Sequence, residues 1–91
     1  MTYYNAREEL RKSVEIADKL HASVYTIFRL DMLTNETSVF RAMFDNAVEG
    51  RLYIENKINS LKSLGVPYAI YLYDKLESAQ GDLKFDSSFN W

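Results

Sequence analysis

The segment from Asn46 to Val66 constrains the fold most, because both ends of a helix can be recognised in it. The side chain of Asn46 can accept a hydrogen bond from the amide of Glu49, which is a variant of the capping box. Gly65 stands where a left-handed residue closes a helix, and Leu61 and Val66 are placed for the apolar contact of a Schellman ending. The pattern predicts a helix over residues 46–64 with an inner stripe of Ala47, Gly50, Ile54, Ile58 or the neighbouring Lys57, Leu61 and Leu64.

Gly50 is unusual inside this helix, where glycine costs ~1 kcal/mol relative to alanine. Because it falls on the inner stripe, we expect the helix to approach the rest of the protein closely at this point rather than to bend there as a functional hinge.

An earlier segment predicts a second helix over residues 5–21. Asn5 and Glu8 repeat the Asn-x-x-Glu cap, and charged residues alternate with an apolar stripe at helical spacing. His21, the single histidine, falls at the end of this segment, where a histidine commonly interacts with the last carbonyl groups of a helix. The stripe consists of Ala6, Leu10, Val14, Ala17 and Leu20 or His21.

Residues 23–32 change character to a run of β-branched and aromatic side chains, which favours a strand. Turn-forming residues 34–37 follow, and residues 38–44 return to a strand pattern, so the two segments predict an antiparallel hairpin. Alternation separates Val24, Thr26, Phe28 and Leu30 from Tyr25, Ile27, Arg29 and Asp31, and separates Phe40, Ala42 and Phe44 from Val39, Arg41 and Met43. Neither side is fully polar, so both faces could be partly covered.

Residues 66–73 predict a third strand that starts near Pro67. Its alternation places Tyr68, Ile70 and Leu72 opposite to Ala69, Tyr71 and Tyr73. A helix with Pro67 at its first position is the competing interpretation. Residues 80–91 form an aromatic tail that is too apolar to remain in water and could add a short strand.

These segments predict a single α+β domain over residues 1–91, in the order helix, strand, strand, helix, strand. We expect a small two-layer domain with the helices on one face of a three- to four-stranded sheet. The order resembles a ferredoxin-like layout that lacks a full first strand, and such a likeness carries no function. The alternative is an all-α bundle of three helices over residues 5–31, 36–64 and 67–79.

The composition narrows the chemistry available to the chain. With 11 basic and 13 acidic residues spread along it, no basic stripe for a nucleic-acid backbone is formed. The chain has no cysteine and one histidine, and no ligand set surrounds that histidine, so we expect no metal site, no cofactor and no catalytic residue. The start of the chain does not resemble a secretion signal, and no apolar run approaches the ~20 residues of a membrane span, so we expect a cytoplasmic protein.

The aromatic side chains remain as the candidate functional feature, because one core layer in so small a domain cannot bury them all. We expect Tyr25, Ile27, Tyr71 and Tyr73 on a sheet face that the helices leave open, which either meets another molecule or is covered by the chain's own aromatic tail. The predicted interaction surface therefore comprises Tyr25, Ile27, Tyr71, Tyr73, Phe85, Phe89 and Trp91.

That surface favours a non-enzymatic protein-interaction module, which we expect to be a small regulator or inhibitor of prokaryotic or phage type. It would act by occupying a partner protein, and a homodimer is one form that the interaction could take. A single-stranded nucleic-acid binder that stacks bases on exposed tyrosines is an alternative, which the charge disfavours. A small-molecule binding domain with a pocket between tail and sheet is another.

Overall fold

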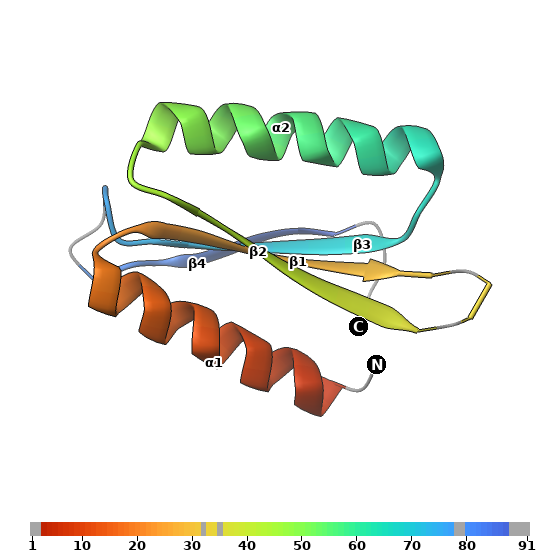
Figure 1. Cartoon of the computed structure of the whole chain (residues 1–91), viewed down its shortest axis with the longest axis horizontal. Coiled ribbons are helices and arrows are strands. Elements are labelled where there is room, and N and C mark those ends of the chain that lie inside the picture. The colour runs from red at the N-terminus through yellow and green to blue at the C-terminus, as the bar shows by residue number, and fades with distance from the viewer. Residues whose placement is uncertain (1–2, 32, 35, 78–79, 88–91) are drawn as a thin grey trace.

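The structure, a computed structural model, describes residues 3–31, 33–34, 36–77 and 80–87 (Figure 1). Among these residues two helices and four strands follow one another, so the α+β prediction is confirmed and the all-helical alternative is wrong. The elements are α1 (Tyr3–Leu20), β1 (Ser23–Leu30), β2 (Thr37–Phe44), α2 (Ala47–Leu64), β3 (Tyr68–Asp74) and β4 (Leu83–Ser87).

The strands form one antiparallel sheet in the order β2-β1-β3-β4. The predicted hairpin is present as β1 and β2, with Ser23 opposite Phe44 and Leu30 opposite Thr37. The third strand pairs with the other side of β1, so β1 lies inside the sheet. The tail contributes β4 at the outer side of β3, which is the short strand that it was expected to add.

The two helices lie on opposite faces of the sheet, so the expected placement on one face, and with it the ferredoxin-like layout, is wrong (Figure 1). On one face, Ser13 of α1 contacts Thr26 of β1 through their hydroxyl groups. On the other face, Ile54 of α2 packs in one cluster with Tyr25 and Ile27. The physical reason is that β1 is apolar on both sides, and a single helix covers only one of them.

The ends of α2 follow the sequence prediction. Asn46 is the N-cap, and its side chain accepts hydrogen bonds from the amides of Val48 and Glu49. Gly65 has φ 68°, and the amide of Val66 donates to the carbonyl of Leu61 at 3.2 Å, which is the long bond of a Schellman ending. Gly50 is also explained, because a Cβ there would lie 3.2 Å from the ring of Phe44 on β2.

The ends of α1 differ from the prediction in detail. The helix begins at Tyr3, so Asn5 lies in the first turn instead of capping it. His21 ends the helix in a left-handed conformation with φ 50°, and the amide of Ala22 donates to the carbonyl of Ala17 at 3.2 Å. His21 therefore takes at the end of α1 the position that Gly65 takes at the end of α2.

A partly buried polar network joins α1 to β2. Arg41 of β2 donates from Nε to the hydroxyl of Ser13 at 2.8 Å and from Nη2 to the carbonyl of Glu9 at 2.9 Å. The same guanidinium pairs with the Glu9 carboxylate. Charge-assisted bonds of this kind lower the pKa of Glu9, although burial acts in the opposite direction.

Candidate functional site

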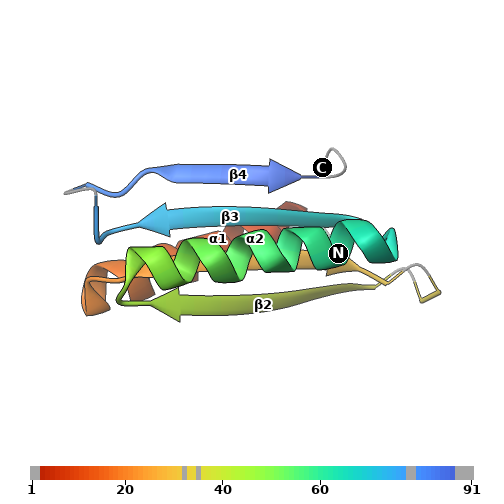
Figure 2. The ribbon, with the colours of Figure 1, turned by 90° about the horizontal axis from the view of Figure 1, so that it is seen from above.

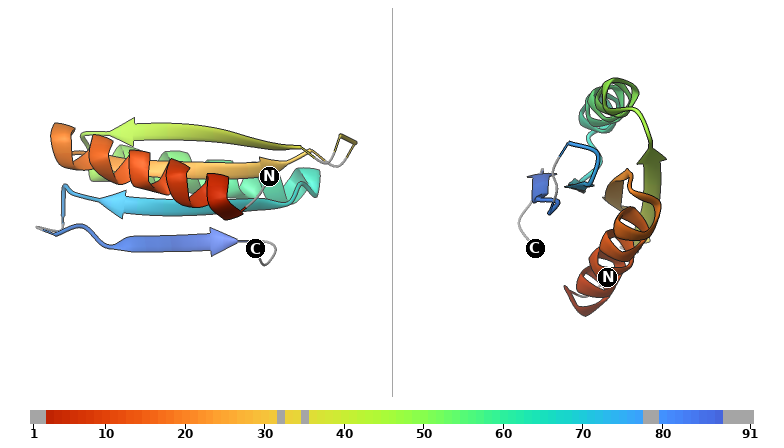
Figure 3. Two further views of the ribbon diagram at one scale, coloured as in Figure 1. Left: turned by 90° about the horizontal axis from the view of Figure 1, so that it is seen from below. Right: turned by 90° about the vertical axis from the view of Figure 1, so that its left-hand side faces the viewer.

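The two long edges of the sheet are covered very differently. Helix α1 contacts β1, β3 and β2, and α2 contacts β2 and β1. Strand β4 lies beyond both helices and packs along β3, as Figures 2 and 3 show from above and below. Within the described residues, no further strand pairs with the outer edge of β4. Among these residues, the outward backbone groups of β4 therefore have no strand partner.

An apolar groove runs between α2 and β4 on the α2 face, and we call it the α2–β4 groove. Its apolar part is a hollow of about 140 Å³ whose walls are two isoleucines of α2 and two charged residues of β4. The side chains that line it are Tyr25, Ile54, Ile58, Ile70, Leu72, Lys84 and Asp86.

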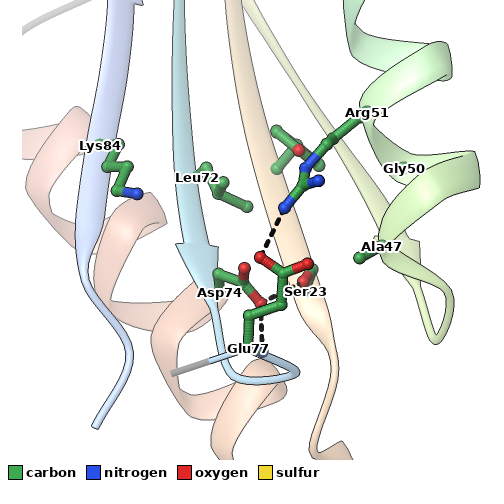
Figure 4. A pocket seen from close by; sticks show the side chains of 9 residues that line it. Ser23, Ala47, Gly50, Arg51, Leu72, Asp74, Glu77 and Lys84 are labelled. Carbon is green, nitrogen blue, oxygen red and sulfur yellow. Dashed lines mark hydrogen bonds and ion pairs between the residues drawn. The ribbon is translucent and has the colours of Figure 1, made fainter. Parts of the chain in front are cut away.

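The groove continues into a polar hollow of about 90 Å³ near the start of α2, and Tyr25, Leu72 and Lys84 line both parts. Figure 4 shows Arg51 reaching from α2 toward Glu77, with 2.5 Å between Nη2 and Oε2. This ion pair closes the end of the groove over the loop that follows β3.

Asp74 organises the loop beneath that ion pair. Its Oδ1 accepts hydrogen bonds from the hydroxyl of Ser23 at 2.6 Å, from the amide of Leu76 at 2.9 Å and from the amide of Glu77 at 3.2 Å. Burial opposes ionisation of Asp74, but these three donors and Arg51 outweigh it, so its pKa is lowered. The donors are held by local structure, and Asp74 therefore fixes the loop that follows β3.

The charged residues of β4 differ in their partners. Asp86 accepts a hydrogen bond from the hydroxyl of Tyr68 at 3.0 Å, whereas Lys84 forms no ion pair within the part of the chain that the structure describes. The ring of Tyr68 is buried, and burial together with the bond to Asp86 raises the pKa of Tyr68. Both Lys84 and Asp86 are exposed and lie on the α2 face. The rim of the groove thus carries one positive and one negative charge two residues apart.

The predicted interaction surface is not a single surface. Residues paired across strands share a face, and Thr26, not Tyr25 or Ile27, stands opposite Tyr71. Tyr25 and Ile27 therefore lie on the α2 face, where they are only 7% and 2% exposed, so their expected exposure is wrong. Tyr71 and Tyr73 lie on the α1 face.

The tyrosines of β3 on the α1 face are engaged within the protein. The Tyr71 ring packs edge-on against Phe28, with 5.9 Å between centroids. The Tyr73 hydroxyl lies 2.6 Å from the carbonyl oxygen of Gln80 and 3.1 Å from a carboxylate oxygen of Asp18. Tyr73 therefore ties the β3–β4 connection to α1, and no open row of tyrosines exists on the described part of the sheet.

Of the three tail residues in the predicted surface, only Phe85 belongs to the described residues. The backbone of Phe85 pairs with Tyr71 at the middle of β4. Phe89 and Trp91 lie outside the described residues.

Sequence reasoning missed the two charged residues that border the groove. Lys84 and Asp86 alternate with the apolar residues Leu83 and Phe85 in the LKFDS segment, and that period of two was the available signal. Ile54 and Ile58 were recognised as the inner stripe of α2, but the sequence does not show that one side of this stripe faces a groove.

The described residues contain no group of three or more histidine, aspartate and glutamate side chains that could hold a metal ion. Among the same residues, no helix is long and apolar enough to cross a membrane. Comparison with known proteins found no matching family model, no matching curated protein and no matching solved structure.

Proposed function

We propose that this protein is a protein-interaction module that binds an extended segment of a partner protein as an additional strand on β4. The observation that carries the proposal is the position of β4 at a sheet edge beyond both helices. In strand addition, backbone hydrogen bonds supply affinity and alternate side chains supply specificity. The module would act as a small regulator or inhibitor by occupying that segment of its partner.

The charges on β4 define the chemistry of the segment. A strand added antiparallel to β4 places one residue opposite Asp86 and, two residues later, one opposite Lys84. Opposite charges at facing positions stabilise a sheet and like charges destabilise it. The partner segment therefore carries a basic residue followed, two positions later, by an acidic residue, both on the α2 face.

The α2–β4 groove adds apolar contact to this recognition. An added strand would lie one strand spacing, about 4.8 Å, beyond β4. A large side chain on its α2 face can reach over β4 toward Ile58 and Leu72, which line the groove. A basic-x-acidic segment flanked by a large apolar residue is thus the best match to the site.

The other two function classes have less support. The hollows of about 140 and 90 Å³ are below the ~300 Å³ at which ligand pockets begin, which disfavours a small-molecule site. Base stacking needs exposed rings, but Tyr25 and Tyr68 are buried, and Tyr73 is bonded to neighbouring elements.

Selection from a library of displayed random peptides tests the proposal. Wild-type protein should enrich peptides with a basic-x-acidic pattern in a β-prone context. Lys84→Glu reverses one rim charge, so it should enrich basic-x-basic peptides instead. Lys19→Glu makes the same charge change on α1 and should enrich the wild-type pattern.

The affinity of an enriched peptide then tests the groove. Ile58→Ala should weaken binding about tenfold, because it removes part of the apolar wall, whereas Leu52→Ala on the exposed side of α2 should leave the affinity unchanged. Recovery of the same peptides from wild type and Lys84→Glu would contradict the proposal, as would failure to enrich any peptide.

A further inference from the structure

We infer that one partner of β4 is a second copy of this chain, which pairs antiparallel with it around a two-fold axis at Phe85. The inference rests on the proposed function in one respect, namely that the β4 edge accepts a strand. The β4 sequence itself is basic-x-acidic at Lys84 and Asp86, which is the pattern that the edge selects. The strand is thus complementary to itself.

The charges fix the register of this pairing. With the axis at Phe85, Lys84 of each copy faces Asp86 of the other, which gives two opposite-charge pairs. An axis at Lys84 would place Lys84 opposite Lys84 and Asp86 opposite Asp82. An axis at Asp86 would place Asp86 opposite itself. Of these three registers, only the central one avoids facing like charges.

The same register also gives the largest overlap. Strand β4 spans Leu83–Ser87, so Phe85 is its midpoint and all five residues find a partner. Backbone pairing and charge pairing therefore favour one arrangement, in which the two four-stranded sheets join into one of eight strands.

The helices do not obstruct this arrangement. Facing residues share a face of the sheet, so the α2 helices of both copies lie on the same side. Each α2 contacts β1 and β2, and the two β1 strands would be five strand spacings, about 24 Å, apart. Packed helices are separated by about 8–10 Å, so the two α2 helices stay clear of each other and their grooves face one another.

The interface is small, because it consists of two five-residue strands and the side chains beside them. We therefore expect a reversible dimer with a dissociation constant in the micromolar range, on the order of 10 to 100 µM. Sedimentation velocity at protein concentrations from about 5 to about 500 µM should show the average mass rising from that of the monomer toward that of the dimer as the concentration passes the dissociation constant.

Two charge variants test the register. Lys84→Glu makes both rim residues acidic, and Asp86→Lys makes both basic, so each should weaken self-association about tenfold. An equimolar mixture should form a one-to-one heterodimer within about threefold of the wild-type affinity, because each copy again faces opposite charges. Lys19→Glu, with the same charge change as Lys84→Glu, should dimerise as the wild type does.

A wild-type protein that is monomeric at every concentration would overturn the inference. Dimerisation that Lys84→Glu leaves unchanged would also overturn it. If Asp86→Lys does not fold because Tyr68 loses its hydrogen-bond acceptor, the comparison of Lys84→Glu with Lys19→Glu still tests whether the β4 charges control dimerisation. Peptide binding without dimerisation would reject only the inference that a second copy binds β4. Dimerisation without peptide binding would reject the proposed function, which is binding of a segment of another protein.

Discussion

The two edge strands of the sheet, β2 and β4, differ in how far the helices cover them. Strand β2 has eight residues, and helices reach it on both faces: Gly50 and Tyr53 of α2 pack on Phe44, and Glu9 and Ser13 of α1 bind Arg41. Strand β4 has five residues and lies beyond the helices. Among the described residues neither edge pairs with a further strand, but side chains of both helices pack on β2, whereas β4 lies beyond the helices.

The difference teaches that charge can both limit and direct strand pairing. Short edge strands and charged residues reduce indiscriminate association of sheets. On β4 the two exposed charges have opposite signs and lie two residues apart, so by our proposal they penalise an added strand with like charges at the facing positions and favour a complementary one. Strand β2 differs in that helices pack on both of its faces.

The largest effect is expected where α1 encloses β2. Arg41→Ala removes hydrogen bonds to Ser13 and to the Glu9 carbonyl and leaves the Glu9 carboxylate without this cation, so the free energy of unfolding should fall by about 2 kcal/mol. Arg41 is only 25% exposed, which limits compensation by water. Urea unfolding measures the change.

Arg11→Ala is the control for that substitution. Arg11 is 56% exposed and pairs with Glu8 and Glu15 on the surface of α1, so its removal should change the stability by less than about 0.5 kcal/mol. Equal losses for the two variants would show that α1 does not anchor β2 through Arg41.

A smaller effect is expected where α2 approaches β2. Gly50→Ala gains helix propensity, but the new methyl group would lie 3.2 Å from the Phe44 ring, which is held between Tyr25 and Tyr53. We expect a net loss of about 1 kcal/mol in thermal or urea unfolding. In a Phe44→Leu background the same substitution should instead stabilise the protein by about 0.5 kcal/mol. Stabilisation in the wild-type background would contradict the close approach.

The smallest effect is the acid sensitivity of the β2 attachment. The pKa of Glu9 is lowered from its ordinary value of 4.5, chiefly by the hydrogen bond from Arg41. The unfolded chain therefore takes up the proton first as the pH falls. The stability due to Glu9 is complete above pH 4.5 and is lost as the pH falls through the lower pKa of the folded state.

The Tm measured as a function of pH tests this contribution. Glu9→Gln should flatten the fall in Tm below pH 4.5 by no more than about 3 °C, because the pair is partly exposed. Glu55→Gln, at an exposed position of α2, serves as the matched control. If Tm falls with pH as steeply in Glu9→Gln as in the wild type, Glu9 does not contribute to the attachment of β2 to α1.

Local sequence patterns predicted most of the elements and their internal alternation. The stop at Gly65 and the cap at Asn46 were correct because helix ends have strong chemical signatures. The separation of Tyr68 from Tyr71 was correct because the strand period is two.

Relations between elements were predicted less well. Alternation shows which residues share a side within a strand, but it does not show which side of β1 matches which side of β3. Tyr25 and Tyr71 were therefore combined wrongly on one face. The side on which each helix packs is decided by the tertiary arrangement, so the open edge at β4 could not be located from sequence.

Amide hydrogen exchange, followed by NMR at about 5 µM and about 500 µM protein, compares the two edges directly. Both edges are monitored in one sample, so neither needs a substitution. The account predicts that outward-facing amides of β4 become about three- to sevenfold more protected at the higher concentration, while those of β2 do not change. Protection that rises at β2, or β4 amides that exchange equally fast in both samples, would contradict the assignment of β4 as the edge that pairs.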